Sequence, residues 1–128
     1  MDIEATATKV IWGALKNSGQ VCVASKRIFV HESIYQQFLA SLVEAAKSLK
    51  VGMGNEEGVK LGPIQNKMQY EKTLDLFRDS IENAHRFVLG GEVQECKGYF
   101  VHPVIIDNPG SDSELWSGEA FGIVGFPS

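Results

Sequence analysis

Cysteine is scarce in this sequence, basic residues are not in excess, and no long apolar run occurs, and each shortage excludes a class of protein. The two cysteines among 128 residues, Cys22 and Cys96, are too few and too far apart for a disulfide scaffold. No apolar stretch approaches the roughly 18 residues that a membrane-spanning helix needs. Lys and Arg number 12 against 16 Asp and Glu, and they are scattered, which argues against a nucleic-acid-binding surface.

The first four residues, Met-Asp-Ile-Glu, are acidic and have no apolar core of the kind found in signal peptides. Without a secretory signal, a disulfide between the two cysteines is not expected, and we predict a cytoplasmic protein. His31, His85 and His102 stand singly, with no partner at helical spacing, so no metal site is predicted. Hydrophobic residues make up 44% of the chain and charged residues 22%, which is ordinary for one soluble globular domain.

Three stretches show the apolar period of a helix. The first covers residues 3–15, where acidic residues favour the start and an Asn-Ser-Gly turn at 17–19 ends it. Gly13 inside this helix is interpreted as a point of close packing. The second stretch runs from Ile34 to Leu49, with Ser33 as the expected N-cap.

The third helical stretch follows Asn66, which is expected to cap it, with Gln69 in the reciprocal position of a capping box. Its predicted apolar seam is Tyr70, Leu74, Phe77, Ile81 and Ala84. The glycine-rich stretch at 50–65 has neither the GxGxxG nor the GxxxxGK spacing of a phosphate-binding loop, so it is predicted to be an irregular surface loop.

Short β-branched and aromatic runs predict the strands, and these lie at residues 27–31, 86–89, 99–106 and in the last stretch, 117–126. Pro103 interrupts the third run and is placed at an edge or a bend. Since helices and buried strands alternate, the fold class is predicted to be α/β, with a mostly parallel sheet flanked by helices.

Residues 17–27 read Asn-Ser-Gly-Gln-Val-Cys-Val-Ala-Ser-Lys-Arg and place Cys22 at the exit of a tight turn, just before a predicted strand. A free cysteine is most often a small buried hydrophobe, so its residue type alone favours a structural role. The chemical alternative requires a thiol that is reachable and that ionises readily. The sequence pattern around Cys22 decides between the two.

That pattern resembles the nucleophile segment of the aldehyde dehydrogenase family, in which the cysteine two residues after Gln attacks the aldehyde carbon. Two further segments resemble the family in the same order: Gly-Tyr-Phe-Val-His-Pro at 98–103 and Glu-Ala-Phe-Gly at 119–122. The resemblance implies that residues 1–128 are part of the family's catalytic domain. It also implies an NAD(P)-dependent oxidation of an aldehyde to a carboxylic acid, through a thiohemiacetal and a thioester on Cys22.

The resemblance assigns two residues to the cofactor, which is NAD or NADP. Glu119 would hydrogen-bond the ribose beside the nicotinamide, and Phe121 would pack beside the nicotinamide ring. The substrate would be a small-molecule aldehyde, which the sequence does not identify further, and the parent family forms homo-oligomers. Two positions depart from the family pattern: Gly118 replaces a residue that is often acidic, and Ile123 replaces the usual proline.

Several parts of the family's machinery have no counterpart in the sequence. These parts are the cofactor-binding domain, the Glu-Leu-Gly-Gly segment with the general base, the Asn of the oxyanion hole and the oligomerisation segment. The 128-residue chain alone is therefore expected to show no significant NAD-dependent turnover. The alternative function is a truncated, non-catalytic relative that acts as a packing or interaction module.

Overall fold

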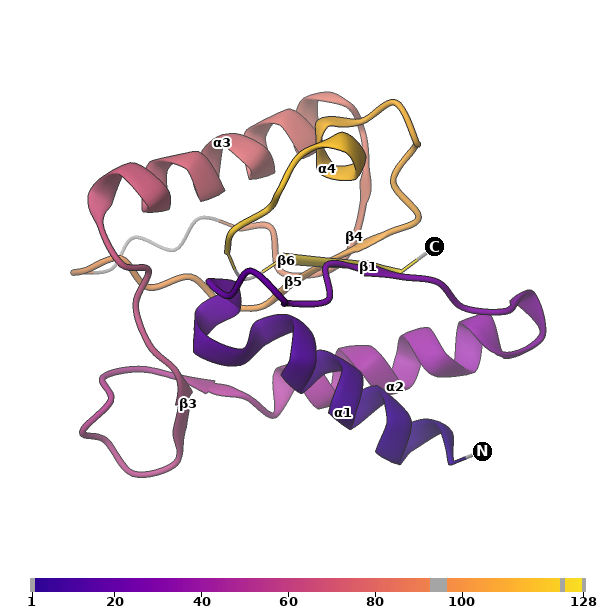
Figure 1. Cartoon of the computed structure of the whole chain (residues 1–128), viewed down its shortest axis with the longest axis horizontal. Helices are drawn as coiled ribbons and strands as arrows, with labels where there is room; N and C mark the ends of the chain where they lie inside the picture. The colour runs from indigo at the N-terminus through magenta and orange to yellow at the C-terminus, as the bar shows by residue number, and fades with distance from the viewer. Residues whose placement is uncertain (1, 93–96, 123, 128) are drawn as a thin grey trace.

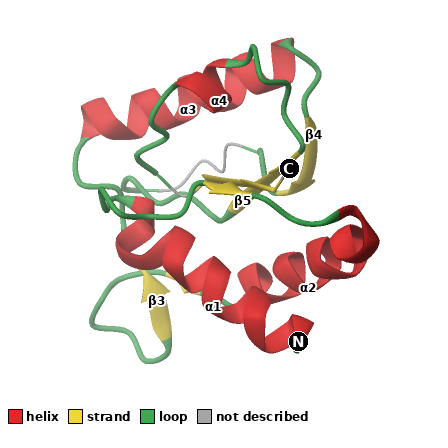
Figure 2. Ribbon diagram, turned by 45° about the vertical axis from the view of Figure 1, so that its right-hand side comes forward, coloured by secondary structure: helices red, strands yellow, loops and turns green. Residues whose placement is uncertain are grey.

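A sheet lies between two pairs of helices in the computed structural model, which describes residues 2–92, 97–122 and 124–127 (Figure 1). One pair covers each face of the sheet, α1 (Ile3–Leu15) with α2 (Tyr35–Lys47) and α3 (Lys67–Glu82) with α4 (Glu114–Ser117) (Figure 2). The predicted α/β class is confirmed, since helices flank both faces of the sheet.

The sheet has four strands in the order β1 (Arg27–Ile28), β6 (Val124–Pro127), β5 (Val104–Asp107) and β4 (Arg86–Leu89). β6 pairs in parallel with both β1 and β5, and β4 pairs antiparallel with β5. The sheet is therefore mostly parallel, as predicted. The pairing of β1 with β6 joins two segments from opposite ends of the sequence, and this neighbourhood positions the site described below.

Helix α1 begins and ends at the predicted residues because its caps are encoded locally. The Asp2 side chain accepts a hydrogen bond from the backbone N–H of Ala5 at 3.0 Å, which satisfies a donor in the first turn. The buried side of α1 includes Ala7 and Ile11, which face the core shared with α2. Gly13 does not mark close packing, because a Cβ built at this position would meet no atom within 4 Å.

Helix α2 begins later than predicted. Residues Glu32–Ile34 form a 3-10 turn, and the Nδ1 atom of His31, not Ser33, accepts the first capping hydrogen bond. The predicted apolar stripe is nevertheless the buried face of α2, where Phe38 and Leu42 are at most 4% exposed. Periodicity thus identified the face of the helix and misplaced its first residue.

Helix α3 is capped by Asn66, whose side chain accepts from the Gln69 N–H at 2.9 Å, as predicted. Its predicted seam is partly wrong: Leu74 and Phe77 are buried, whereas Ile81 is 59% exposed. The small polar residues Thr73 and Ser80 take the remaining buried positions, because their hydroxyls donate to backbone carbonyls one turn earlier.

Predictions for three stretches need correction. The run at 99–106 is a strand only from Val104 onward, in β5 (Val104–Asp107). The run at 27–31 is a strand only over Arg27–Ile28, and Phe29 is 73% exposed instead of buried. The stretch at 50–65 is not wholly irregular, because β2 (Lys50–Val51) and β3 (Val59–Leu61) pair in parallel as a small second sheet. By contrast, β4 spans the predicted residues, and Pro103 lies just outside β5, where it disturbs no ladder.

Asp107 at the end of β5 joins three elements and is expected to contribute strongly to stability. The Asp107 side chain is 8% exposed. Its carboxylate accepts hydrogen bonds from the Tyr35 hydroxyl of α2 at 2.5 Å and from Arg86 of β4 at 2.9 Å. Asp107→Ala is expected to lower the free energy of unfolding by about 2–3 kcal/mol, since it removes the acceptor of two hydrogen bonds.

Urea unfolding of the two variants Asp107→Ala and Arg86→Met checks this expectation. The Arg86 side chain is 68% exposed, so its loss is expected to cost less than about 1 kcal/mol. If Asp107→Ala were no more destabilising than Arg86→Met, the buried carboxylate would not be the centre of this contact.

Candidate active site

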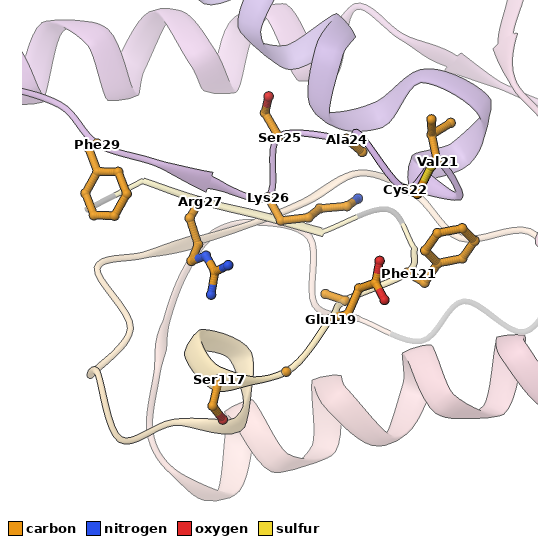
Figure 3. A pocket seen from close by; sticks show the side chains of 12 residues that line it. Val21, Cys22, Ala24, Ser25, Lys26, Arg27, Phe29, Ser117, Glu119 and Phe121 are labelled. Carbon is orange, nitrogen blue, oxygen red and sulfur yellow. The ribbon is translucent and has the colours of Figure 1, made fainter.

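Two segments far apart in the sequence meet at one edge of the sheet. Residues 17–26 lead into β1, and residues 118–122, here called the strap, precede β6. Because β1 and β6 are parallel neighbours, the amino ends of both strands lie at the same edge. Their lead-in segments therefore face each other, and Figure 3 shows Cys22 on one and Glu119 and Phe121 on the other. The fold brings together the three site residues predicted from the sequence.

The turn before Cys22 is left-handed at three successive residues. Asn17, Ser18 and Gly19 have φ values of 53°, 57° and 72°. A left-handed backbone is costly for residues with a Cβ, so Asn17 and Ser18 need external support. That support comes from the segment before α3: the Ser18 hydroxyl donates to the Gly62 carbonyl at 2.7 Å, and Gln20 accepts from the Gln65 N–H at 2.8 Å.

Cys22 lies at the tip of a second turn, which the Ala24 N–H closes onto the Val21 carbonyl at 2.9 Å. The thiol is free and exposed. The burial that its residue type favours is therefore wrong, and reagents in solution can reach the side chain. The side chain lines a pocket of about 500 Å³.

The strap forms the opposite wall of this pocket and is fixed from α3. The Gln69 side-chain amide donates to the Phe121 carbonyl at 2.6 Å. This contact replaces the reciprocal capping bond that the sequence predicted for Gln69. Gly122 packs against Thr73 so closely that a Cβ would lie 2.8 Å from the Thr73 hydroxyl oxygen. The backbone of the strap is thus held against the first two turns of α3.

Glu119 and Phe121 each border two hollows. They line the Cys22 pocket and also a second pocket of about 560 Å³, whose other wall includes Gln69, Lys72 and Asp75 of α3. Glu119 is exposed, Phe121 is half-buried, and Ala120 between them is 2% exposed. The small buried residue anchors the strap, so the carboxylate and the ring remain available to a bound molecule.

Lys26 also lines the Cys22 pocket, and its amine bridges two elements. The Nζ atom donates to the Ala14 carbonyl of α1 at 3.1 Å and to the Gly122 carbonyl of the strap at 2.5 Å. Burial lowers the pKa of Lys26 from 10.5 to about 8, because the charged form loses solvation. A partly buried cation therefore lies between the cysteine segment and the strap.

Phe29 lines the pocket at the end away from Cys22 (Figure 3). Phe29 and Trp116 meet edge to face, with ring centroids 5.8 Å apart. Arg27 donates from Nη1 to the Trp116 carbonyl at 2.5 Å, which ties α4 to β1. The exposure of Phe29, unexpected from the sequence, is explained by this position on the pocket rim.

Lys26 and Gln69 are the residues of the site that the sequence did not indicate. Each side chain acts on a backbone carbonyl of the strap, a contact that leaves no pattern in residue spacing. Among the residues described, no group of three His, Cys, Asp or Glu side chains could hold a metal ion. Within the same part of the chain, no helix is long and apolar enough to cross a membrane.

Comparisons with known proteins agree on one family. The model of the aldehyde dehydrogenase family matches residues 1–125. A mitochondrial aldehyde dehydrogenase of Leishmania tarentolae is 39% identical over 123 residues, which are 96% of this chain and 25% of that protein. A peroxisomal aminoaldehyde dehydrogenase of Pisum sativum is 36% identical over 97% of this chain and 25% of its own length.

Solved structures give the same result for the fold. An NAD+ complex of aldehyde dehydrogenase from Bacillus cereus matches with a TM-score of 0.92 and 31% identity, over 99% of this chain and 26% of that chain. The chain therefore spans about a quarter of the length of the relatives it matches.

Proposed function

Because the chain belongs to the aldehyde dehydrogenase family, we propose that it forms the nucleophile-bearing part of an NAD(P)-dependent aldehyde dehydrogenase. The observation that carries the proposal is the pocket in which Cys22 faces Glu119 and Phe121. These residues come from segments about 100 positions apart, and the family resemblance assigns a role in the same reaction to all three.

Cys22 is proposed as the nucleophile. Its thiolate attacks the aldehyde carbon to form a thiohemiacetal, and loss of hydride leaves a thioester on the same sulfur. Water then hydrolyses the thioester, which releases the carboxylic acid and regenerates the thiol. The exposed position of Cys22 at the tip of a turn supports this role, since an aldehyde can approach the sulfur from the pocket.

Glu119 and Phe121 are proposed to hold the nicotinamide half of NAD or NADP. An exposed carboxylate can accept hydrogen bonds from ribose hydroxyls, and a half-buried ring offers an apolar face to a planar group. Both side chains border the two hollows, so a ligand lying across the strap would touch both of them. When bound, the cofactor would accept the hydride.

The general base and the oxyanion-hole Asn implied by the resemblance have no counterpart in these 128 residues. We therefore propose that residues 1–128 act as part of the catalytic domain of a longer polypeptide, one that assembles into homo-oligomers as the family does. A cytoplasmic location stays a prediction, since the relatives include proteins named as mitochondrial, chloroplastic and peroxisomal.

A chimera tests the proposed function. Residues 1–125 of this chain would replace the matching quarter of the Bacillus cereus aldehyde dehydrogenase, to which the backbone is closely similar. The chimera is expected to oxidise aldehydes with NAD+ at about a tenth of the parent's rate, which allows about 1.4 kcal/mol for imperfect positioning. The measurement is NADH formation by absorbance, with aldehydes of different size and charge.

The 128-residue chain alone serves as the control and is expected to form no NADH. Steady NADH production by this chain would contradict the need for the remaining domains. A folded chimera that binds NAD+ and oxidises no aldehyde would instead favour the alternative, a non-catalytic packing or interaction module.

A further inference from the structure

Lys26 occupies a position where one side chain can hold two elements of the site together. Its Nζ atom lies 3.1 Å from the Ala14 carbonyl, in the last turn of α1, and 2.5 Å from the Gly122 carbonyl of the strap. Carbonyls at the end of a helix have no partner within that helix, so the amine satisfies an acceptor there. Its positive charge also interacts favourably with the negative end of the helix dipole. The second contact reaches across 96 residues of sequence.

The backbones on either side of this amine are already in close contact. A Cβ built on Gly19 would lie 1.9 Å from the Gly122 oxygen and 2.4 Å from Lys26 Nζ. The turn before Cys22, the amine and the strap therefore form one junction, with no space for a Cβ at position 19. Movement of the strap away from the cysteine segment has to break the contact between Lys26 and Gly122.

On its other side the strap is held by Gln69, which donates to the Phe121 carbonyl from α3. Consecutive carbonyls of the strap thus have partners on opposite walls, with Gln69 on Phe121 and Lys26 on Gly122. Of these two, only the Lys26 contact links the strap to the segment that carries Cys22.

We propose that Lys26 is a positioning residue, which holds the strap against the cysteine segment and so sets the distance from the Cys22 thiol to the residues that would hold the cofactor. The meaning of this inference for catalysis rests on the proposed function, whereas the junction itself can be tested without any activity.

The amine also makes the junction sensitive to pH. Both carbonyls still have a donor after deprotonation, because a neutral amine keeps two N–H groups. The pKa of Lys26 in the closed junction is about 8, whereas an opened junction restores it to 10.5. The opened form therefore binds more protons between these pH values, so the closed form gains stability as pH rises from 8 to 10.5. The other titratable side chains that line the pocket are Cys22 and Arg27 of the cysteine segment and Glu119 of the strap.

Amide hydrogen exchange of the full chain tests the proposal, with rates corrected for intrinsic exchange at each pH. In Lys26→Met, which keeps the length of the side chain and removes the donor, the amides of residues 118–122 are expected to exchange at least about tenfold faster. The amides of α3 (Lys67–Glu82) are the internal reference and are expected to change less than about twofold. Lys26→Arg, which restores a donor, is expected to recover most of the protection.

The pH profile distinguishes positioning by the Lys26 amine from simple packing of the aliphatic part of its side chain. In the wild-type chain, protection of the strap is expected to rise at least about tenfold between pH 8 and pH 10, and in Lys26→Arg it should stay constant. Three results would each overturn the inference. These are unchanged exchange of the strap amides in Lys26→Met, exchange in α3 that accelerates as much as in the strap, and a pH profile in Lys26→Arg equal to that of the wild type. If Lys26→Met does not fold, the comparison with Lys26→Arg still decides. An inactive chimera would count against the proposed function and leave the junction intact.

Discussion

Replacing Cys22 by serine is expected to lower kcat/KM for aldehyde oxidation by the chimera at least about a thousandfold. A serine hydroxyl keeps the size and position of the nucleophile, but it ionises far less readily than a thiol. No histidine lines the pocket among the residues described, so the hydroxyl would have no neighbouring imidazole to remove its proton. The loss should appear in kcat, because the substitution leaves the strap, which is proposed to hold the cofactor, unchanged.

The matched control is Cys96→Ser, which removes the only other thiol in the sequence and is expected to leave the rate unchanged. Binding of NAD+ to both variants, measured by fluorescence quenching, should equal that of the unsubstituted chimera. Retention of aldehyde oxidation by Cys22→Ser, together with its loss in Cys96→Ser, would show that the nucleophile had been assigned to the wrong cysteine.

Gly19→Ala is expected to lower the free energy of unfolding of the chain by about 3 kcal/mol or more. Two effects act together at this position. The φ of 72° is unfavourable for any residue with a Cβ, and the added atom would lie 1.9 Å from the Gly122 oxygen. Neither atom of that contact belongs to a flexible side chain, so the backbone of the turn or of the strap has to move.

Gly13→Ala provides the matched control, since it makes the same chemical change in the same chain. Gly13 lies inside α1 with open space around its Cα, and alanine is expected to stabilise the helix by about 0.5–1 kcal/mol. Urea unfolding of both variants gives their free energies of unfolding. The rate at which a thiol reagent labels Cys22 reports whether the turn before it has changed. A neutral effect of Gly19→Ala would mean that the turn and the strap are not in the contact described.

Local signals in the sequence predicted the elements whose ends are encoded nearby. Asp2 and the turn after Leu15 fixed the first helix at its observed residues, and Asn66 did the same for the start of α3. The predicted strand over Arg86–Leu89 also has its observed length, because two glycines follow it. In each case the stop or start signal lies within a few residues of the boundary.

Features that depend on distant partners could not be predicted in this way. The sequence resemblance grouped Cys22, Glu119 and Phe121 by analogy, but nothing local indicated that Gln69 would donate to the strap instead of to its own helix cap. The contact of Phe29 with Trp116, which lies 87 positions later, likewise follows no periodic pattern. Residue patterns describe single elements well and describe contacts between elements poorly.

The position of the site also departs from the usual rule for parallel sheets. Ligands of open α/β folds most often bind beyond the carboxyl ends of the strands. Here Cys22 and the strap lie before the amino ends of β1 and β6, and backbone turns rather than strand termini present the side chains. The sharp left-handed turn at Asn17–Gly19 is what directs Cys22 toward the strap from this side.

The pairing of β1 with β6 also has a consequence for biosynthesis. When β1 leaves the ribosome, its partner strand has not yet been made, and the contact from Lys26 to Gly122 spans 96 residues. At translation rates of roughly 5–20 residues per second, the nascent chain carries an unpaired strand edge next to the Cys22 segment for roughly 5–20 s. During that interval the strap, which forms one wall of the Cys22 pocket, has not yet been made.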